Sequence, residues 1–496
     1  MHSTAETRPL TQDARERLIA ALGRVLPRKA ILSDPEELRP YECDGLSAYR
    51  QVPGLVVLPD TTEQVQAILK CCSEQAVPVV ARGAGTGLSG GALPLKNGVL
   101  LSLARFNRIL EIDPHNRVAR VQPGVRNLAI SEAARPWGLY YAPDPSSQIA
   151  CTIGGNVAEN SGGVHCLKYG LTVHNVLGLE LLTMDGERLR IGGVALDSPG
   201  YDLLALLHGS EGMLGVITEV TVRLLPEPRS ARVVMAAFDD VARAGDAVSR
   251  IIAAGIVPAG LEMMDRLAIR AAEDFVHAGY PTDAAAILLC ELDGTGAEVE
   301  SGIERVETIL RGAGATSLRS SRDDADRLRL WAGRKAAFPA VGRLAPDYYC
   351  MDGTIPRHRL AEVLTRISEM SERYGLPVAN VFHAGDGNLH PLILYDANRP
   401  GELETAERFG GEILELCVAV GGTITGEHGV GIEKIDQMCV QFAAPELARF
   451  HAVKATFDPQ GLLNPGKAVP TLHRCAEFGA MHVHRGELPF PGLERF

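Results

Sequence analysis

The sequence predicts a protein of the α+β class with more than one domain. A chain of 496 residues exceeds what a single hydrophobic core supports. Short apolar strands dominate the first half, whereas helical patterns alternate with strands in the second half, and a proline cluster at 226–228 separates the two regions. An apolar fraction of 46% and a charged fraction of 22% are ordinary for a globular enzyme.

Charge and composition exclude several functional classes. The net charge of -12 argues against a nucleic-acid partner, since no basic cluster could neutralise phosphates. The first thirty residues lack the apolar core of a signal peptide, and no apolar run approaches the roughly 18 residues that span a bilayer. We therefore expect a cytoplasmic protein. The ten cysteines show no Cys-x-x-Cys spacing, so electrons leaving this chain would need another carrier than an iron-sulfur cluster of its own.

The first elements lead to a glycine-rich loop. Residues 10–40 predict an amphipathic helix that ends among prolines. Two short buried strands, at 54–59 and 77–81, flank a helix that extends through Ser73. The second strand runs directly into the loop at 82–91.

This loop contains the spacing Gly-x-Gly-x-x-Gly at Gly85, Gly87 and Gly90. A Rossmann dinucleotide fold requires that spacing to open a helix, but here Pro94 and a further strand at 99–103 follow. The Rossmann hypothesis therefore fails, and a flexible linker would not lie between two apolar strands. The loop instead predicts backbone amides that surround an anion such as pyrophosphate without a helix.

Small residues recur at 152–163, after a strand-rich stretch at 99–125 and a predicted helix at 127–135. Such a density of small residues lets a flat ligand lie against the backbone, while the asparagine and serine side chains of the segment supply hydrogen bonds. The alternative is a tightly packed turn between strands. Strands resume at 176–191 and at 216–225.

The second region has a different pattern. Helices and strands alternate there without an internal repeat, as expected for a separate α+β domain. The predicted elements are helices around 240–254, 263–277 and 297–312 and a strand at 286–292.

The stretch from residue 383 to residue 431 concentrates metal-binding side chains. His383 and His390 lie seven residues apart, and Glu427 and His428 follow one intervening helical pattern. Imidazole nitrogen and carboxylate oxygen suit borderline metal ions, and three protein ligands leave a position open for substrate. Two glycines between the first two histidines indicate a strand and a turn. Core or surface histidines with local hydrogen bonds are the alternative for any one of these residues.

Seven motifs occur in a distinctive order. They are Arg82-Gly83-Ala84-Gly85-Thr86-Gly87, Pro143-Asp144-Pro145-Ser146-Ser147, Ile153-Gly154-Gly155-Asn156, Gly209-Ser210-Glu211-Gly212, His383 to His390, Glu427-His428-Gly429 and Asn464-Pro465-Gly466-Lys467. Together they resemble the FAD-linked 2-hydroxy-acid oxidoreductases of the vanillyl-alcohol-oxidase type, over roughly residues 40–470. Within this family the resemblance is strongest to the flavin-carrying D subunits of bacterial glycolate oxidases, through residues 331–342 and 348–354.

The resemblance implies an α+β architecture with a two-part FAD-binding domain of the vanillyl-alcohol-oxidase (PCMH) type, an α+β substrate or cap domain and a helical C-terminal segment. The implied divisions are an N-terminal helical segment at 1–49, the FAD-binding domain at 50–228, the substrate domain at 229–421, a C-terminal segment returning to the flavin at 422–470, and a tail at 471–496.

The resemblance also implies noncovalent FAD, because the loop lacks the histidine through which some relatives attach the cofactor. The residues expected to hold FAD are Arg82, Gly83, Ala84, Gly85, Thr86, Gly87, Leu88, Ser89, Pro143, Asp144, Ser147, Gly154, Gly155, Asn156, Asn160, Ser161, Glu211, Gly212, Ile217 and Asn464.

The family assigns His383, His390 and Glu427 to a divalent metal and His428 to the catalytic base. Oxidation of a 2-hydroxy acid removes the hydroxyl proton and transfers the α-hydrogen as hydride to the flavin. A metal on the substrate oxygens lowers the pKa of the hydroxyl, and an imidazole accepts its proton near neutral pH. The ligands suit zinc, manganese and iron alike.

Residues around the cluster bear on the substrate. Arg334 is the candidate for binding the substrate carboxylate, with an exposed arginine on a basic helix as the alternative. Phe338 and Cys350 stand where hydroxyglutarate-specific relatives carry a polar residue and a lysine, so a small monocarboxylate is favoured. Asp386 and Asn388 are expected to orient the metal ligands.

The favoured function is oxidation of a small 2-hydroxy acid, glycolate first and D-lactate next, to the 2-oxo acid. Alternatives are a D-lactate or D-2-hydroxyglutarate dehydrogenase and a noncatalytic flavin-binding subunit, which the retained site residues argue against. A metal-dependent hydrolase would leave the glycine-rich motifs unexplained. The expected partners are a second flavin-domain subunit and an iron-sulfur subunit. Association with a membrane would come through these partners, since no span of the chain's own is expected.

Overall fold

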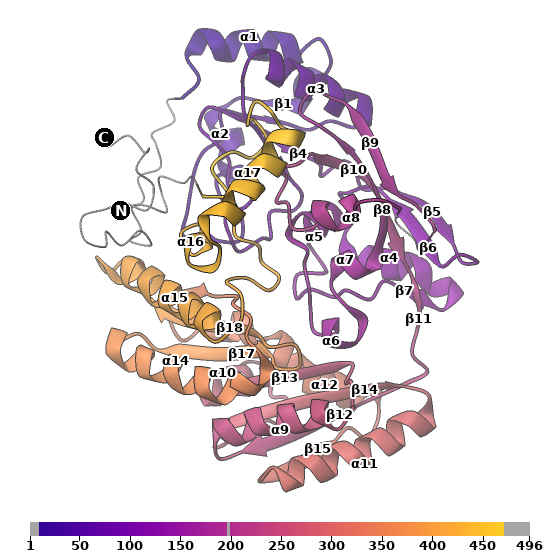
Figure 1. Cartoon of the computed structure of the whole chain (residues 1–496), viewed down its shortest axis with the longest axis vertical. Coiled ribbons are helices and arrows are strands. Elements are labelled where there is room, and N and C mark those ends of the chain that lie inside the picture. Colours follow the sequence, from indigo (N-terminus) through magenta and orange to yellow (C-terminus); the bar gives the residue numbers. More distant parts are fainter. Residues whose placement is uncertain (1–8, 196–198, 471–496) are drawn as a thin grey trace.

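The computed structural model describes residues 9–195 and 199–470. Its two halves are stacked along the long axis, with three sheets in one half and a single large sheet in the other (Figure 1). The chain fills the first half, crosses once to the second at β12 (Ser230–Phe238), and returns to the first half at its end. The mixture of sheets and covering helices confirms the predicted α+β class.

The first sheet of the first half carries the glycine-rich loop. Its strand order is β1–β2–β4–β3, and β4 is parallel to both of its neighbours. Its strands are β1 (Ile31–Leu32), β2 (Leu55–Val57), β3 (Val79–Arg82) and β4 (Val99–Ser102). Since no helix intervenes between β3 and β4, the rejection of the Rossmann hypothesis is confirmed.

A five-stranded antiparallel sheet completes most of the first half, in the order β5–β6–β10–β8–β9. Its strands are β5 (Ile109–Asp113), β6 (Val118–Val121), β8 (Val176–Leu182), β9 (Arg188–Gly192) and β10 (Val216–Arg223). A two-stranded pair joins β7 (Leu139–Tyr140) to β11 (Leu225–Pro226). The α-helices of this half are α1 (Gln12–Leu22), α2 (Pro35–Leu38), α3 (Thr62–Glu74), α4 (Asn127–Ala134), α5 (Ile153–Glu159), α6 (Cys166–Tyr169), α7 (Thr172–Asn175) and α8 (Leu203–Leu207).

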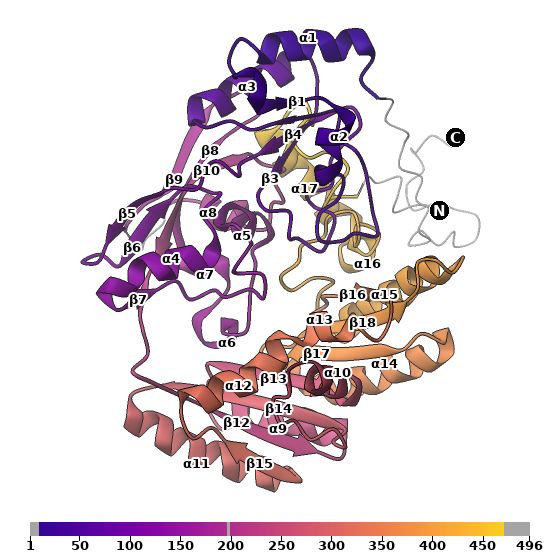
Figure 2. The ribbon, with the colours of Figure 1, turned by 180° about the vertical axis from the view of Figure 1, so that it is seen from behind.

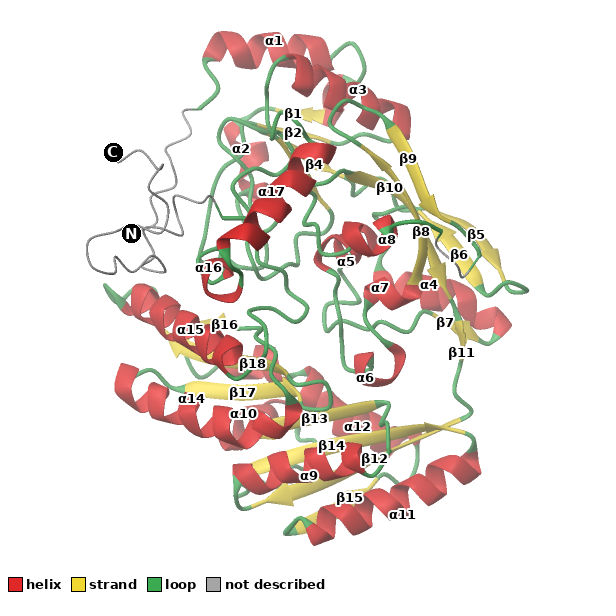
Figure 3. Ribbon diagram, in the orientation of Figure 1, coloured by secondary structure: helices red, strands yellow, loops and turns green. Residues whose placement is uncertain are grey.

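The second half is one antiparallel sheet with helices on both faces (Figures 2 and 3). Its strand order is β15–β12–β14–β13–β17–β18–β16. Side chains alternate along β12, so that Val234 and Phe238 join one buried cluster while Val233 and Met235 join the other. The remaining strands are β13 (Gly260–Asp265), β14 (Ala286–Gly294), β15 (Ser317–Ser320), β16 (Asp347–Cys350), β17 (Val378–His383) and β18 (Asn388–Tyr395).

The two buried clusters assign the helices to opposite faces of this sheet. The larger cluster takes residues from α9 (Val241–Ala253), α11 (Gly296–Gly312), α14 (Leu360–Tyr374) and α15 (Glu402–Ala419). The other takes residues from α10 (Arg266–Val276), α12 (Asp324–Lys335) and α13 (Ala337–Val341). The sheet is therefore buried on both faces.

One predicted helix begins too early. Residues 263–265 belong to β13, which pairs with both β14 and β17, and α10 starts only at Arg266. The physical reason is Asp265, whose side chain accepts a hydrogen bond from the backbone of Ala268 and caps the helix.

The C-terminal segment returns to the first half through α16 (Met438–Gln441) and α17 (Ala444–Phe457). There Leu463 forms a bridge to Val79 of β3. Within residues 9–195 and 199–470, no helix is both long and apolar enough to cross a bilayer. The predicted tail at 471–496 lies outside the described residues, and the other predicted domain boundaries stay predictions.

Candidate active site

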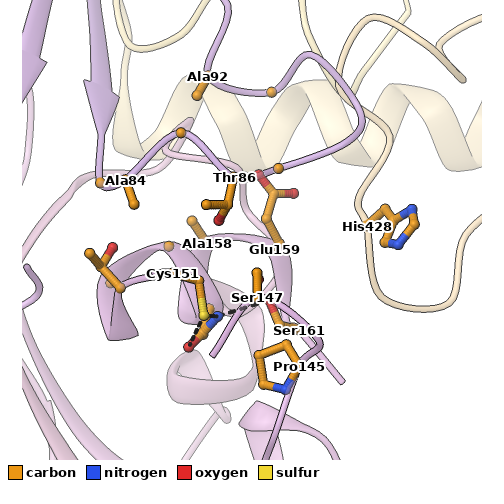
Figure 4. A pocket seen from close by; sticks show the side chains of 18 of the residues that line it. Ala84, Thr86, Ala92, Pro145, Ser147, Cys151, Ala158, Glu159, Ser161 and His428 are labelled. Carbon is orange, nitrogen blue, oxygen red and sulfur yellow. Dashed lines mark hydrogen bonds between the residues drawn. The ribbon is translucent and has the colours of Figure 1, made fainter. Parts of the chain in front are cut away.

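A cavity of about 510 Å³ joins the two halves of the molecule. The first half contributes the glycine-rich loop and α5, and the second contributes the end of α12, the start of α13 and β18. His428, on a loop of the C-terminal segment, faces the labelled side chains of the first half across this space (Figure 4). The cavity thus brings together segments that lie more than 300 residues apart in the chain.

Backbone rather than side chain forms most of the first wall. Gly85 adopts φ +69°, which favours glycine. A Cβ atom at Gly154 would lie 2.5 Å from the Cβ of Pro123, and one at Gly83 would collide with the hydroxyl of Thr152. Glycine at 83 therefore lets the loop lie against the N-cap of α5, and glycine at 154 lets α5 lie against Pro123, where a larger side chain would not fit.

Most residues predicted to hold FAD do line the cavity. Those that line it are Arg82, Gly83, Ala84, Gly85, Thr86, Gly87, Leu88, Ser147, Gly154, Gly155, Asn156, Ser161, Glu211, Gly212 and Ile217. Five predicted residues do not line it: Ser89, Pro143, Asp144, Asn160 and Asn464. Direct contact of these five residues with FAD stays a prediction.

These five residues form hydrogen bonds with segments that surround the cavity. The Ser89 carbonyl accepts hydrogen bonds from two backbone amides of the C-terminal segment, at Ile432 and Glu433. The Asn464 amide donates to the carbonyls of Gly91 and Glu211. Of the remaining three, the Pro143 carbonyl accepts from Asn127, Asp144 binds His165, and Asn160 accepts from the amide of Val173.

The segment rich in small residues is the helix α5, so the alternative of a turn between strands is wrong. It ends at Asn160, whose left-handed conformation (φ +54°) closes the helix. The Asn156 side chain accepts from Asn127 at 3.1 Å and donates to Ser161 at 3.3 Å. These hydrogen bonds fix the orientation of the Asn156 and Ser161 side chains, both of which line the cavity.

The two predicted metal-ligand histidines lie on one hairpin. β17 and β18 pair so that Val381 lies opposite His390 and His383 lies opposite Asn388. Residues two apart on a strand point to the same face, so His383 and His390 are diagonal neighbours there. Their ring centroids are 5.1 Å apart, and both side chains are almost fully buried. The predicted strand and turn are confirmed.

Glu427 completes the predicted ligand set. Its Oε1 atom lies 3.3 Å from Nε2 of His383 and 3.0 Å from Nε2 of His390. The three ligand atoms lie within 4.8 Å of one another. A buried carboxylate and two converging imidazole nitrogens form a donor set that fits a divalent cation.

Asp352 holds the loop that presents Glu427. Its fully buried carboxylate accepts hydrogen bonds from the backbone amides of Gly426, Glu427 and His428 and from the Thr425 hydroxyl. Because one carboxylate satisfies three successive amides, the loop has a single conformation at the site.

Glu262 of β13 orients the first histidine. Its Oε1 accepts from Nδ1 of His383 at 2.8 Å, and its Oε2 accepts from Nε of Arg334 at 2.7 Å. Burial opposes ionisation, but the charges of His383 and Arg334 outweigh it and lower the pKa of Glu262. The Asp386 carboxylate accepts a hydrogen bond from the Asn388 backbone, and the predicted orienting role of these two residues stays a prediction.

Arg334 is therefore committed to Glu262 and does not line the cavity. Its side chain is 2% exposed, so the alternative of an exposed arginine is wrong, while a role in binding the substrate carboxylate stays a prediction. The next residue, Lys335, does line the cavity, as does Phe338 one turn further along. The local reason is the helical periodicity of α12, which turns adjacent residues to different faces.

His428 stacks on His390 with 5.0 Å between ring centroids and 11° between ring planes. Burial is the main cause that lowers the pKa of His428 to about 4, against the opposing charge of Asp352. Its Nδ1 atom is buried and has no hydrogen-bond partner within the described part of the chain. A neutral imidazole at the cavity wall can accept a proton.

Four charged residues of the site were missed from the sequence: Glu262, Asp352, Glu159 and Lys335. The first two are charged residues inside or directly after an apolar strand pattern, which is the signal that could have found them. Glu159 lines the cavity, and burial together with the nearby charge of Glu211 raises its pKa. No pattern in the sequence marks Glu159.

Comparisons with known proteins relate both regions that line this cavity to FAD-linked enzymes. The model of the FAD binding domain matches residues 53–192, and that of the C-terminal domain of FAD linked oxidases matches residues 227–468. The chain is 69% identical to the glycolate oxidase subunit GlcD of Escherichia coli K12, over 97% of both chains. It is 40% identical to the GlcD subunit of Bacillus subtilis, over 92% of this chain and 97% of that one. It is 32% identical to a D-lactate dehydrogenase of Anaerostipes hadrus, over 91% of this chain and 96% of that one.

The fold has solved counterparts. The crystal structure of p-cresol methylhydroxylase superposes with a TM-score of 0.80 at 18% identity, over 94% of this chain and 98% of that chain. The 4-ethylphenol oxidase of Gulosibacter chungangensis gives a TM-score of 0.77 at 19% identity, over 94% and 99% of the two chains. These likenesses confirm the predicted architecture. The chain belongs to the FAD-linked oxidases and is an FAD-dependent oxidoreductase of the group that includes the glycolate oxidase subunit GlcD.

Proposed function

We propose that this enzyme oxidises glycolate, with D-lactate as the next candidate, to the corresponding 2-oxo acid. One observation carries the proposal: a single cavity joins the glycine-built wall to the cluster of His390, Glu427 and His428. The 69% identity to a glycolate oxidase subunit supports glycolate as the substrate. When bound, FAD accepts the hydride that leaves the substrate carbon. We propose that it is held noncovalently, because the loop at 82–91 contains no histidine.

The ligand set proposed for a divalent metal is His383, His390 and Glu427. When bound, the metal would lower the pKa of the substrate hydroxyl. The fit rests on the converging ligand atoms and on the negative surroundings that the Glu262 and Glu427 carboxylates provide. Glu262 accepts from Nδ1 of His383 and so leaves Nε2 free to face the metal position.

His428 is proposed as the base that accepts the hydroxyl proton. It lines the cavity next to Glu427, and the Asp352 carboxylate fixes its backbone. Lys335 places a positive charge on the same wall, where it attracts the substrate carboxylate. Phe338 packs against His390 at 6.2 Å between ring centroids and limits the room for a larger acid.

The partners are proposed to be a second flavin-domain subunit and an iron-sulfur subunit that carry electrons away. Support comes from the relatives, two of which are named as glycolate oxidase subunits. Association with a membrane through these partners and a cytoplasmic location stay predictions. The alternative of a D-2-hydroxyglutarate dehydrogenase is disfavoured because Phe338 offers no polar group for a second carboxylate.

The test is anaerobic stopped-flow reduction of the bound flavin by a panel of glycolate, D-lactate, L-lactate and D-2-hydroxyglutarate, with metal analysis of the same sample. We expect the largest ratio of rate to half-saturating concentration with glycolate. His428→Ala should retain the flavin absorption bands but lose substrate-driven bleaching. Normal bleaching in that variant would refute the role of His428. A stronger preference for D-2-hydroxyglutarate would refute the substrate.

A further inference from the structure

A second group of metal-binding atoms adjoins the proposed metal ligands. Cys350, His390 and His428 each offer one ligand atom, and these atoms lie within 4.8 Å of one another. Cys350 ends β16 and pairs with Leu392 of β18. His390 lies two residues from Leu392 on the same strand, so its side chain and that of Cys350 point to the same face of the sheet. The register of β16 and β18 therefore places the thiol on the same face as the His390 imidazole, and the loop at 428 brings the second imidazole to them.

Two of the three potential ligand residues, Cys350 and His428, have polar atoms with few or no hydrogen-bond partners among the described residues. The Nδ1 atom of His428 is buried without a partner among the described residues. The Cys350 thiol makes one weak contact, with the carbonyl of Met351 at 3.4 Å, and the residue is 4% exposed. The Cys350 thiol has no role in the proposed oxidation, whereas His428 is its proposed base. Buried polar atoms without partners are uncommon and indicate a ligand or a functional constraint.

The donor chemistry of this group differs from that of the proposed catalytic ligands. One sulfur and two imidazole nitrogens select soft or borderline cations, whereas a carboxylate adds an oxygen donor that harder cations accept. The two sets share His390 and take adjacent residues, Glu427 and His428, from one loop, so they differ in the third ligand, which is His383 in one set and Cys350 in the other. A cation bound by Cys350, His390 and His428 would coordinate the His428 imidazole, which could then not act as the proposed base.

We propose that Cys350, His390 and His428 form an inhibitory site for thiophilic divalent cations, of which Cd²⁺ is the probe and Zn²⁺ in excess the natural candidate. Binding releases the thiol proton to solvent and forms a cation–sulfur bond and two cation–nitrogen bonds, with no change in oxidation state. It removes His428 from the substrate. The inhibitory consequence rests on the proposed function, but the binding itself does not.

The test adds Cd²⁺ to the FAD-loaded full-length enzyme and records the ultraviolet thiolate-to-cadmium charge-transfer band and the proton released. The wild-type protein should show the band and be inhibited. Cys350→Ser should lose the band, and its half-inhibitory Cd²⁺ concentration, relative to its own cadmium-free rate, should rise at least about tenfold. Cys417→Ser is the matched control, because Cys417 is also buried nearby but belongs to neither ligand group. It should behave as wild type.

Glu427→Gln separates this site from the proposed catalytic metal. The substitution removes a proposed catalytic ligand but none of the three members of the inhibitory group. The cadmium band should therefore persist while activity is lost. Loss of the band in Glu427→Gln, or a band and inhibition that survive in Cys350→Ser, would overturn the inference. If activity proves independent of metal while the cadmium band is present, the proposed catalytic metal fails and the inhibitory site stands.

Discussion

The two walls of the cavity are built by opposite means. In the first half, closely packed backbone forms the wall, and glycines at positions such as 83, 85 and 154 make the approach possible. On the other side, the ionisable side chains of His390, Glu427 and His428 line the cavity, and buried carboxylates hold their surroundings: Glu262 binds the neighbouring His383, and Asp352 holds the loop of Glu427 and His428.

This difference predicts which kind of substitution each wall tolerates. A backbone wall tolerates changes in side-chain chemistry but not added volume, because its contacts are close and mostly shape-determined. A wall of buried charged groups tolerates little change in chemistry, because loss of one partner leaves another buried and unsatisfied. Substitutions that preserve volume should therefore act mainly on the second wall, and substitutions that add volume mainly on the first.

The largest effect is expected from Glu427→Gln. The variant keeps the side-chain volume but removes the negative charge between His383 and His390. We expect stoichiometric metal to be lost and flavin reduction by glycolate to fall by about 10³-fold, while the flavin bands persist. Metal analysis and stopped-flow absorbance measure both. Glu433→Gln is the control, because that buried carboxylate binds Lys434 instead of the histidines. Equal metal content in Glu427→Gln and wild type would contradict the ligand assignment.

A smaller effect is expected from Glu262→Gln. The amide still accepts one hydrogen bond from His383 but supplies no charge to it or to Arg334. Metal affinity, measured by chelator competition, should fall by about 10–100-fold. Glu291→Gln is the matched control, since Glu291 is equally buried on the neighbouring strand β14 but bonds Arg327 and Trp331. If both variants lose metal equally, the orienting role of Glu262 is excluded.

The backbone wall is tested by two neighbouring glycines of α5. Gly155→Ala adds a Cβ whose nearest neighbour is the Thr152 hydroxyl at 3.4 Å, whereas Gly154→Ala adds one 2.5 Å from Pro123. We expect Gly155→Ala to fold normally but to weaken FAD binding by about tenfold, because its methyl group enters ligand space. Gly154→Ala should lower the unfolding midpoint itself. Fluorescence titration of the apoprotein with FAD and thermal unfolding distinguish the two. Unchanged FAD affinity in Gly155→Ala would show that the cofactor does not lie against α5.

The smallest effect concerns an ion pair that joins the two halves. His165 donates to Asp144 of the first half at 2.8 Å and lies 3.3 Å from Glu291 of the second. Burial disfavours its charge, but the two carboxylates outweigh burial and raise the pKa of His165 to about 10. Since the folded-state pKa exceeds the unfolded value of about 6.5, the contribution to stability is complete below pH 6.5 and disappears as pH rises toward 10.

We therefore expect wild type to exceed His165→Gln in stability by about 1 kcal/mol at pH 6 and by almost nothing at pH 10. The partial exposure of the side chain, 27%, reduces the effect by solvent screening. Urea unfolding midpoints of both proteins across this range provide the measurement. A constant difference between them at all pH values would exclude a charged histidine at this position.

Local patterns in the sequence determined much of this protein. The β-branched runs predicted the strands on either side of the glycine-rich loop, and the absence of a helix after that loop excluded a Rossmann fold. The glycines between His383 and His390 predicted a hairpin, because a turn and alternating strand geometry are local properties.

Only the tertiary structure decided which charged groups serve the site. Glu262 lies 121 residues before His383, and Asp352 lies 75 residues before Glu427. Arg334 and Lys335 are adjacent in the chain, yet Arg334 is buried against Glu262 while Lys335 lines the cavity. The positions of these charged residues depend on the order of the strands in the sheet and on which face of a helix packs against its neighbours. Strand order and helix packing are set by contacts between segments that are distant in the chain. Such contacts produce no local sequence pattern from which they could be predicted.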